Sequence, residues 1–166
     1  MARRSNSAPN PSDDVVITGE VRAPRDLVFE AWTNPKHVAR WWGPSGFSNS
    51  RCEIDLRPGG AIRIDLVAPD GTLYPMTGFF QEILEPEKLI FSTSPVDGLG
   101  HPLLDVLNTV IFTDRGDRTR IAIEVQVLRS TEESEPFLTG MESGWMQSLD
   151  RLNSYLARVT KSAPEE

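Results

Sequence analysis

The C-terminal segment from Ser134 to Val159 places the strongest constraint on how this chain can fold. At about 100° per residue, the spacing of an α-helix, its large apolar side chains fall within an arc of roughly 80°. These residues are Leu138, Met141, Trp145, Leu149, Leu152, Leu156 and Val159. Because Gln147, Asp150 and Arg158 lie on the opposite side, the segment predicts an amphipathic helix with one face that needs a partner.

The apolar face changes in character along this helix. Its C-terminal half is made of leucine and valine, which pack to a fixed shape, whereas Phe137, Met141, Trp145 and Met146 in the N-terminal half are large or pliable. Two interpretations follow. Either the whole face belongs to a filled core, or its N-terminal half covers a ligand cavity.

The residues before this helix predict the surface against which it packs. A strand at 15–22 is followed by two short helices, at 25–32 and from Pro35 to the tryptophan pair Trp41 and Trp42. Six strands joined by turns follow, at 47–56, 61–68, 73–84, 88–93, 104–113 and 119–128. Consecutive hairpins indicate an antiparallel sheet.

One face of that sheet is predicted to be dry. In the last strand, Ile121, Ile123, Val125 and Val127 alternate with polar or small residues. Only the C-terminal helix is long enough to cover such a face. We therefore expect an α+β fold in which a curved antiparallel sheet wraps around a long C-terminal helix, with two short helices after the first strand.

Length and charge narrow the class of protein. The 166 residues predict one domain, at 13–160, preceded by a disordered arm at 1–12 and followed by a tail at 161–166. A net charge of -7 argues against nucleic acid as a partner. No apolar stretch is long enough to span a membrane and no secretory signal is recognisable, so we expect a cytoplasmic protein, either a monomer or a homodimer.

Several short motifs, in order and at their spacings, resemble a known family. They are Ala23-Pro24, 31–35 (AWTNP), 41–44 (WWGP), 55–60 (DLRPGG), 69–71 (PDG), 78–80 (GFF) and Gly144-Trp145. The series is similar to that of the family named after the C-terminal domain of the activator of heat-shock protein 90 ATPase. That family lies in the START-like (SRPBCC) superfamily, which has the helix-grip or Bet v-like fold. The resemblance implies a hollow between the sheet and the N-terminal half of the long helix, walled in part by the two short helices.

The residues themselves point to the same place, and we predict a small apolar or aromatic ligand there. Gly78 removes a side chain in mid-strand, which indicates a bend or a close approach by another element. Strand alternation favours inward-facing side chains two residues apart on neighbouring strands. The predicted ligand-binding residues are Trp41, Tyr74, Met76, Phe91, Thr93, Met141 and Trp145. Of the adjacent tryptophans, we expect one ring in the core and the other at the rim.

Candidate catalytic groups are few. The two histidines, His37 and His101, lie far apart, and no ligand spacing indicates a metal or another cofactor. Cys52 lies within a predicted strand, where a free cysteine usually behaves as a small apolar residue. His101, in a loop rich in glycine and proline, could reach the mouth of the hollow or simply be solvated.

Three functions remain open. The first is non-catalytic binding of a small apolar molecule. The second, implied by the family resemblance, is a co-chaperone that activates a chaperone ATPase. The third, known in the wider superfamily, is a polyketide cyclase or aromatase, for which Tyr74, Thr93 or His101 would supply the polar group. We favour a protein that is not an enzyme.

Overall fold

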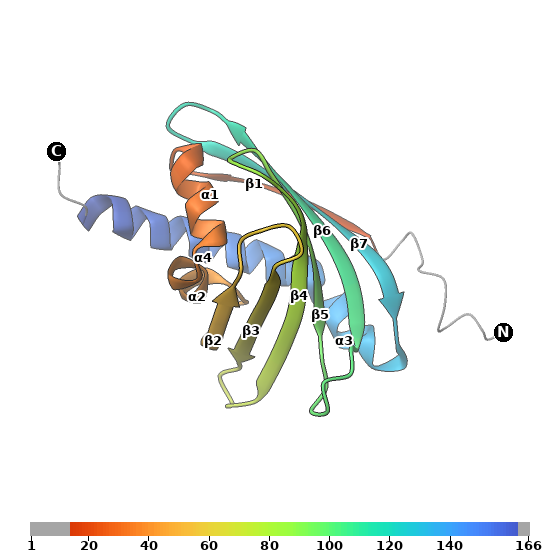
Figure 1. The fold of residues 1–166 in the computed structure, drawn as a ribbon. Coiled ribbons are helices and arrows are strands. Elements are labelled where there is room, and N and C mark those ends of the chain that lie inside the picture. Colours follow the sequence, from red (N-terminus) through yellow and green to blue (C-terminus); the bar gives the residue numbers. More distant parts are fainter. Residues whose placement is uncertain (1–13, 163–166) are drawn as a thin grey trace.

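A computed structural model describes residues 14–162, in which one antiparallel sheet curves around a long helix (Figure 1). The seven strands lie in the order β1-β7-β6-β5-β4-β3-β2, so each neighbours the next in sequence except that β1 pairs with β7. The strands are β1 (Val15–Val21), β2 (Ser48–Ile54), β3 (Ala61–Val67), β4 (Leu73–Leu84), β5 (Lys88–Pro95), β6 (Leu104–Asp114) and β7 (Thr119–Ser130). The predicted α+β helix-grip fold is confirmed.

The concave face of the sheet is dry, as the alternation predicted. Four side chains of β7 are buried: Ile121, Ile123, Val125 and Val127. Their neighbours on the paired strand β6 include Val106, Val110 and Phe112, which are also buried. Residues directly opposite each other on paired strands point to the same face. One apolar surface therefore continues across neighbouring strands and needs a cover.

The cover is α4 (Met141–Ser162), which crosses the concave side of the sheet (Figure 1). Its C-terminal half buries Leu149, Leu152 and Leu156, and Leu152 is completely inaccessible. Asn153 fixes this half to the end of β1, because its side chain donates to the Glu20 carbonyl (2.9 Å) and accepts from the Arg22 amide (3.1 Å).

Two short helices follow β1, of which the second packs beside α4 and the first packs on the second and on β6 (Figure 1). They are α1 (Arg25–Thr33) and α2 (Pro35–Trp41). Asn34 separates them and caps α2, its side-chain oxygen accepting from the Lys36 amide at 3.0 Å, while Pro35 occupies a first-turn position that needs no amide proton. The Tyr155 hydroxyl of α4 lies 2.5 Å from Nδ1 of His37 on α2.

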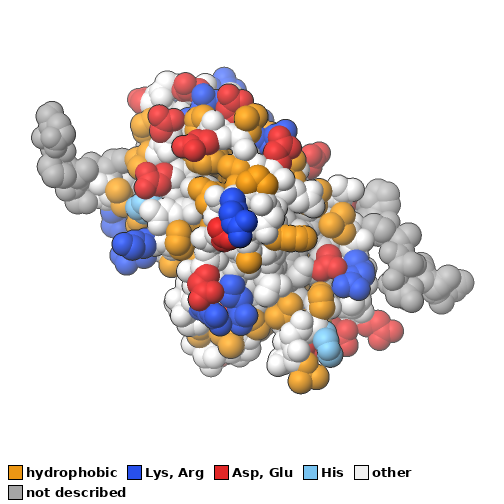
Figure 2. Space-filling model, viewed as in Figure 1, with side chains coloured by type: hydrophobic (Ala, Val, Ile, Leu, Met, Phe, Trp, Pro, Cys, Tyr) orange, Lys and Arg blue, Asp and Glu red, His pale blue; other side chains and the backbone are white. Residues whose placement is uncertain are grey.

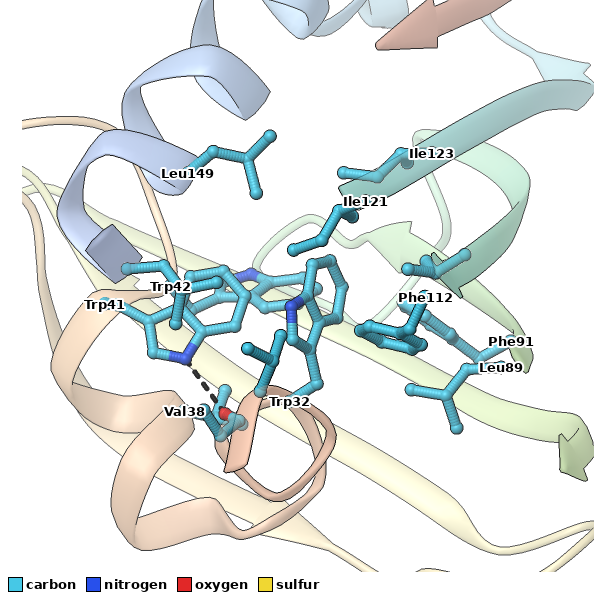
Figure 3. Close-up of a cluster of buried hydrophobic side chains, with 14 of the residues drawn as sticks. Trp32, Val38, Trp41, Trp42, Leu89, Phe91, Phe112, Ile121, Ile123 and Leu149 are labelled. Carbon is cyan, nitrogen blue, oxygen red and sulfur yellow. Dashed lines mark hydrogen bonds between the residues drawn. The ribbon is translucent and has the colours of Figure 1, made fainter. Parts of the chain in front are cut away.

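Between these elements and the sheet lies an aromatic core (Figure 3). The ring of Trp32 packs against those of Trp41 and Trp42, with centroid distances of 4.9 and 6.0 Å. It also meets Phe112 of β6 edge-on at 5.7 Å. Edge-to-face and tilted pairs of this kind are favourable beyond the area they bury. This end of the molecule is a packed aromatic core, with one small void of about 20 Å³ bordered by Trp32, Trp42 and Phe91.

The predicted helix beginning at Ser134 is interrupted, which corrects the sequence interpretation. A 3-10 turn, η3 (Glu132–Ser134), leads into a short helix, α3 (Glu135–Thr139), and α4 begins only at Met141. Gly140 lies between them with φ and ψ of -92° and 3°. Glycine is a weak helix former, so the chain can leave the helical path here at little cost.

At the other end, α4 reaches Ser162 and so extends into the tail predicted at 161–166. The predicted arm at 1–12 and residues 163–166 lie outside the described residues. Among the helices that are described, none combines the length and the apolar character needed to cross a membrane.

The outer face of the sheet, in view over β2 to β5 in Figure 2, carries charged, polar and hydrophobic side chains intermixed. At Gly78 of β4 the backbone of a neighbouring strand approaches closely, which is one of the two alternatives predicted for this glycine. A β-carbon built there would lie 1.9 Å from the Ser92 carbonyl oxygen, which belongs to the neighbouring strand β5. A residue with a β-carbon would fit at this position only if β4 and β5 moved apart.

Candidate functional site

A cavity of about 200 Å³ lies between the sheet and the N-terminal half of α4. Its roof is Phe137 of α3, Gly140, and Met141, Gly144, Trp145 and Ser148 of α4. Its floor comes from β3 to β7: Leu66, Tyr74, Pro75, Met76, Thr93, Pro95, Leu104, Val106, Asn108 and Val125. Trp42, Gly43 and Pro44, which follow α2, make one side wall. Apolar side chains dominate, with a few polar groups among them, as is typical of small-molecule sites.

Trp145 separates the cavity from the filled aromatic core. Its ring stacks on Trp32 with a centroid distance of 5.7 Å and an interplanar angle of 14°, and meets Trp42 edge-on at 5.2 Å. These contacts hold the indole in one orientation while the same residue lines the cavity. A ligand would therefore meet an aromatic wall that is already ordered.

The side wall is bonded to the roof through the loop 43–45. Nη1 of Arg151 donates to the carbonyl oxygens of Gly43 and Pro44, both at 2.9 Å. In the opposite direction, the Gly43 amide donates to Ser148 Oγ (3.1 Å) and the Ser45 amide to Gln147 Oε1 (2.9 Å). Partial burial lowers the pKa of Arg151 below its ordinary value, but an arginine with a lowered pKa remains charged at neutral pH.

The floor contains two buried polar side chains. Asn108 of β6 is 1% exposed, and its Nδ2 donates to the Phe91 carbonyl (3.2 Å) and to Thr93 Oγ1 (3.1 Å). Thr93 of β5 is also buried. Burying an amide is costly unless it is hydrogen-bonded. An apolar side chain would fill the same space without this cost, so the hydrogen-bonded pair is notable on the cavity floor.

Five of the seven predicted ligand-binding residues line this cavity: Tyr74, Met76, Thr93, Met141 and Trp145. The strand register explains the first two, because Tyr74 lies opposite Leu66 and Met76 opposite the buried Ile64. Tyr74 is 39% exposed and lies at the mouth. That a ligand touches these residues stays a prediction.

The other two predicted residues, Trp41 and Phe91, are not among the residues that line this cavity. Trp41 is completely buried, and its Nε1 donates to the Ala31 carbonyl at 2.9 Å, the hydrogen bond drawn in Figure 3. Its neighbour Trp42 lines the cavity instead. Phe91 lies in the core between Trp42 and Phe80, with centroid distances of 6.3 and 6.0 Å. Thr93, two residues further on, reaches the cavity.

Of the candidate catalytic groups, Tyr74 and Thr93 line the cavity, and His101 and Cys52 do not. His101 is exposed in its loop, 3.6 Å from the Asp97 carboxylate, and is not among the cavity residues. Burial raises the pKa of the Cys52 thiol to about 11, so it is protonated at neutral pH and a poor nucleophile. Within residues 14–162, no group of three or more His, Cys, Asp or Glu side chains is placed to hold a metal ion.

Two other hollows, of about 340 and 350 Å³, are larger, but we place the candidate site in the apolar cavity. One hollow is bordered by Arg25, Glu87 and Lys88, and the other by Arg40, Asp150 and Arg151 among further polar residues. Water solvates these charged groups well, although Leu84, Ile111 and Phe112 also line the first hollow. The smaller cavity is lined by uncharged, largely apolar residues, as is typical of small-molecule sites.

Sequence reasoning missed Asn108 at this site and chose Trp41 rather than Trp42 from the tryptophan pair. A signal for Asn108 is present, since it interrupts the dry positions Leu104, Val106, Val110 and Phe112 of β6. A polar residue in such a series indicates either a strand irregularity or a polar group facing a cavity. No comparable signal distinguishes Trp42 from its neighbour, because the choice depends on where α2 ends.

A seven-stranded sheet gripping a C-terminal helix, with an apolar cavity under the start of that helix, defines the chain as a helix-grip protein. The family model described as "Activator of Hsp90 ATPase homolog 1-like protein" matches residues 22–157, and the chain belongs to this family. A search of proteins with curated functions gave no significant match.

Solved structures from several bacteria share the fold. A solution structure of a protein from Arthrobacter aurescens is 25% identical, with a TM-score of 0.78, and the match covers 93% of this chain and 92% of that one. A crystal structure from Mycobacterium smegmatis is 22% identical with a TM-score of 0.76, covering 98% of each chain. The AHSA1 protein of Silicibacter pomeroyi is 19% identical with a TM-score of 0.74, covering 87% of this chain and 97% of that one.

Proposed function

We propose that this protein binds a small apolar or aromatic molecule, without transforming it, in the cavity beneath the start of α4. The observation that carries the proposal is the cavity itself, about 200 Å³ within a wall of tryptophan, methionine, leucine and valine side chains. An apolar cavity of roughly 150 Å³ in another protein is known to stay dry and to bind benzene. The volume here suits one substituted aromatic ring.

The ordered wall supports the same proposal. Trp145 is held by Trp32 and Trp42, and the loop 43–45 is bonded to α4. A site that is ordered before the ligand arrives loses less conformational entropy on binding. His101 and Cys52 lie outside the lining of the cavity, and among the described residues the polar side chains that line it are Tyr74, Thr93, Asn108 and Ser148, without a histidine, thiol or carboxylate beside them.

The test is calorimetric titration with ethylbenzene, together with tryptophan fluorescence, which would report a ligand beside Trp42 and Trp145. The variant Val106→Phe places a ring into the cavity from β6. We expect saturable binding to the native protein and its loss in this variant. Binding that is unchanged in Val106→Phe would place the ligand elsewhere, and no binding to the native protein would refute the proposal.

Family membership favours a second candidate, activation of a chaperone ATPase. The family description names an Hsp90 ATPase activator, which is a statement about the family's namesake. Adding the purified chain to the Hsp90-type chaperone of the same organism and measuring ATP hydrolysis tests this candidate. An unchanged rate at saturating concentration of the chain would reject it.

A further inference from the structure

Asn108 and Thr93 leave two specific hydrogen-bonding positions on the cavity floor. The Phe91 carbonyl, lying directly across the β5–β6 ladder, can only accept, so the Asn108 nitrogen must face it. The second amide proton goes to Thr93 Oγ1. Both donors of Asn108 are therefore used within the sheet, and among the described residues nothing donates to its Oδ1.

Thr93 has an unused donor, whereas Asn108 has an unused acceptor. Its hydroxyl oxygen accepts from Asn108, and its own proton has no acceptor among the described residues. Both residues are more than nine-tenths buried and both line the cavity. An acceptor and a hydroxyl proton without a partner among the described residues therefore lie on the cavity floor. Each can form a hydrogen bond with a group that enters the cavity.

The residues that line the cavity carry no charge. Among residues 14–162, none of those that line it is Lys, Arg, His, Asp or Glu. An ion that entered would lose its hydration without meeting a counter-charge, which is far more costly than burying a neutral group. The group that pairs with Asn108 and Thr93 must therefore be neutral, and it must donate one hydrogen bond and accept another.

A hydroxyl group meets these requirements. We propose that the ligand is a neutral phenol or a similarly small apolar alcohol, whose hydroxyl donates to Asn108 Oδ1 and accepts from Thr93 Oγ1. This inference rests on the proposed function, because it names the class of molecule that the same cavity binds. The ring then lies under Met141 and against Trp145, where the cavity is apolar.

Three probes of similar shape test the inference: 4-ethylphenol, 4-ethyltoluene and the 4-ethylbenzoate anion. In calorimetric titration of the native protein at neutral pH, we expect 4-ethylphenol to bind about tenfold more tightly than 4-ethyltoluene, the gain expected of hydrogen bonds to otherwise unpaired groups. We expect 4-ethylbenzoate to bind more weakly than either neutral probe.

Variants assign the preference to the two side chains. Thr93→Val keeps the shape and removes the hydroxyl, and Asn108→Leu removes the amide. In both, the preference for 4-ethylphenol should fall to about twofold or less. Thr109→Val makes the same change on the opposite face of β6 and should retain the full preference. If Asn108→Leu does not fold, Thr93→Val decides the matter.

The outcomes separate this inference from the proposed function. Equal binding of 4-ethylphenol and 4-ethyltoluene would overturn the hydroxyl assignment and leave apolar binding intact. A preference that persists in Thr93→Val, or tighter binding of the benzoate, would also overturn it. If none of the three probes binds, the proposed function fails together with the inference.

Discussion

The two halves of α4 face the same sheet and have opposite surroundings. From Leu149 to Leu156 the apolar face is buried, and a β-carbon on Gly19 of β1 would lie only 3.2 Å from Leu149 Cδ1. Before Leu149, Met141 and Trp145 are only half-buried and lie over a cavity. The two halves of one helix therefore differ in role. The C-terminal half packs in the core and stabilises the fold, and the N-terminal half covers the cavity.

The largest expected effect is in the packed half. Leu152→Ala should lower the free energy of unfolding by about 2–5 kcal/mol, because Leu152 is wholly buried and the surroundings cannot close over the void. Met141→Ala, at the cavity, should cost about 1 kcal/mol, since only part of its side chain is removed from water. Urea unfolding measures both. Equal losses would mean that the two halves do not differ in packing.

The next prediction adds volume on one strand. Val110→Phe should destabilise by roughly 1–3 kcal/mol, because Val110 is completely buried in the filled core. Val106→Phe, four residues earlier on the same face of β6, should be close to neutral, because its ring enters the cavity. Thermal unfolding of the two variants compares them. A large loss in Val106→Phe would show that the cavity cannot accept a side chain.

A smaller effect is expected where the two halves meet. Arg151→Met should cost about 1–2 kcal/mol, since it keeps the apolar stem and removes the charge-assisted hydrogen bonds to Gly43 and Pro44. It should also weaken binding of ethylbenzene, because the side wall of the cavity is no longer fixed. Urea unfolding and calorimetry measure these effects. Unchanged affinity with reduced stability would show that the loop does not order the site.

The smallest effect has the opposite sign. Gly144→Ala should stabilise by up to about 1 kcal/mol, because alanine is the better helix former and its β-carbon would meet only Pro44 Cγ, at 3.9 Å. The same substitution at Gly19, opposite the packed half, should destabilise, since Leu149 would have to move. Thermal unfolding distinguishes the two. Destabilisation by Gly144→Ala would indicate a crowded roof.

Most of the fold could be predicted because it depends on periodicity. The succession of strands along the chain, the dry face of β7 and the change in character along α4 all follow from the spacing of residues in the sequence, whereas the pairing of β1 with β7 does not. The break at Gly140 did not follow, since an isolated glycine within a helical pattern is often tolerated. Whether Gly140 interrupts the helix depends on how α3 packs against the rest of the protein, which the local sequence does not determine.

The site could be predicted less completely than the fold. Strand alternation was enough to place Tyr74, Met76 and Thr93 on the inner face, but it does not say how far along the strand the filled core ends. Phe91 and Thr93 share a face of β5, and only Thr93 reaches the cavity. The positions of Trp41 and Trp42 depend on the exit angle of α2, which local sequence does not determine.

The bonds between α4 and the loop 43–45 have a consequence for hydrogen exchange. The Gly43 and Ser45 amide protons are donated to side chains of α4 rather than to water or to their own loop. The Gly43 bond is buried, so exchange of this amide with deuterated solvent requires that the helix and the loop separate, whereas the Ser45 bond is exposed. The Gly43 amide thus serves as a natural reporter of how often the roof of the cavity lifts from its wall.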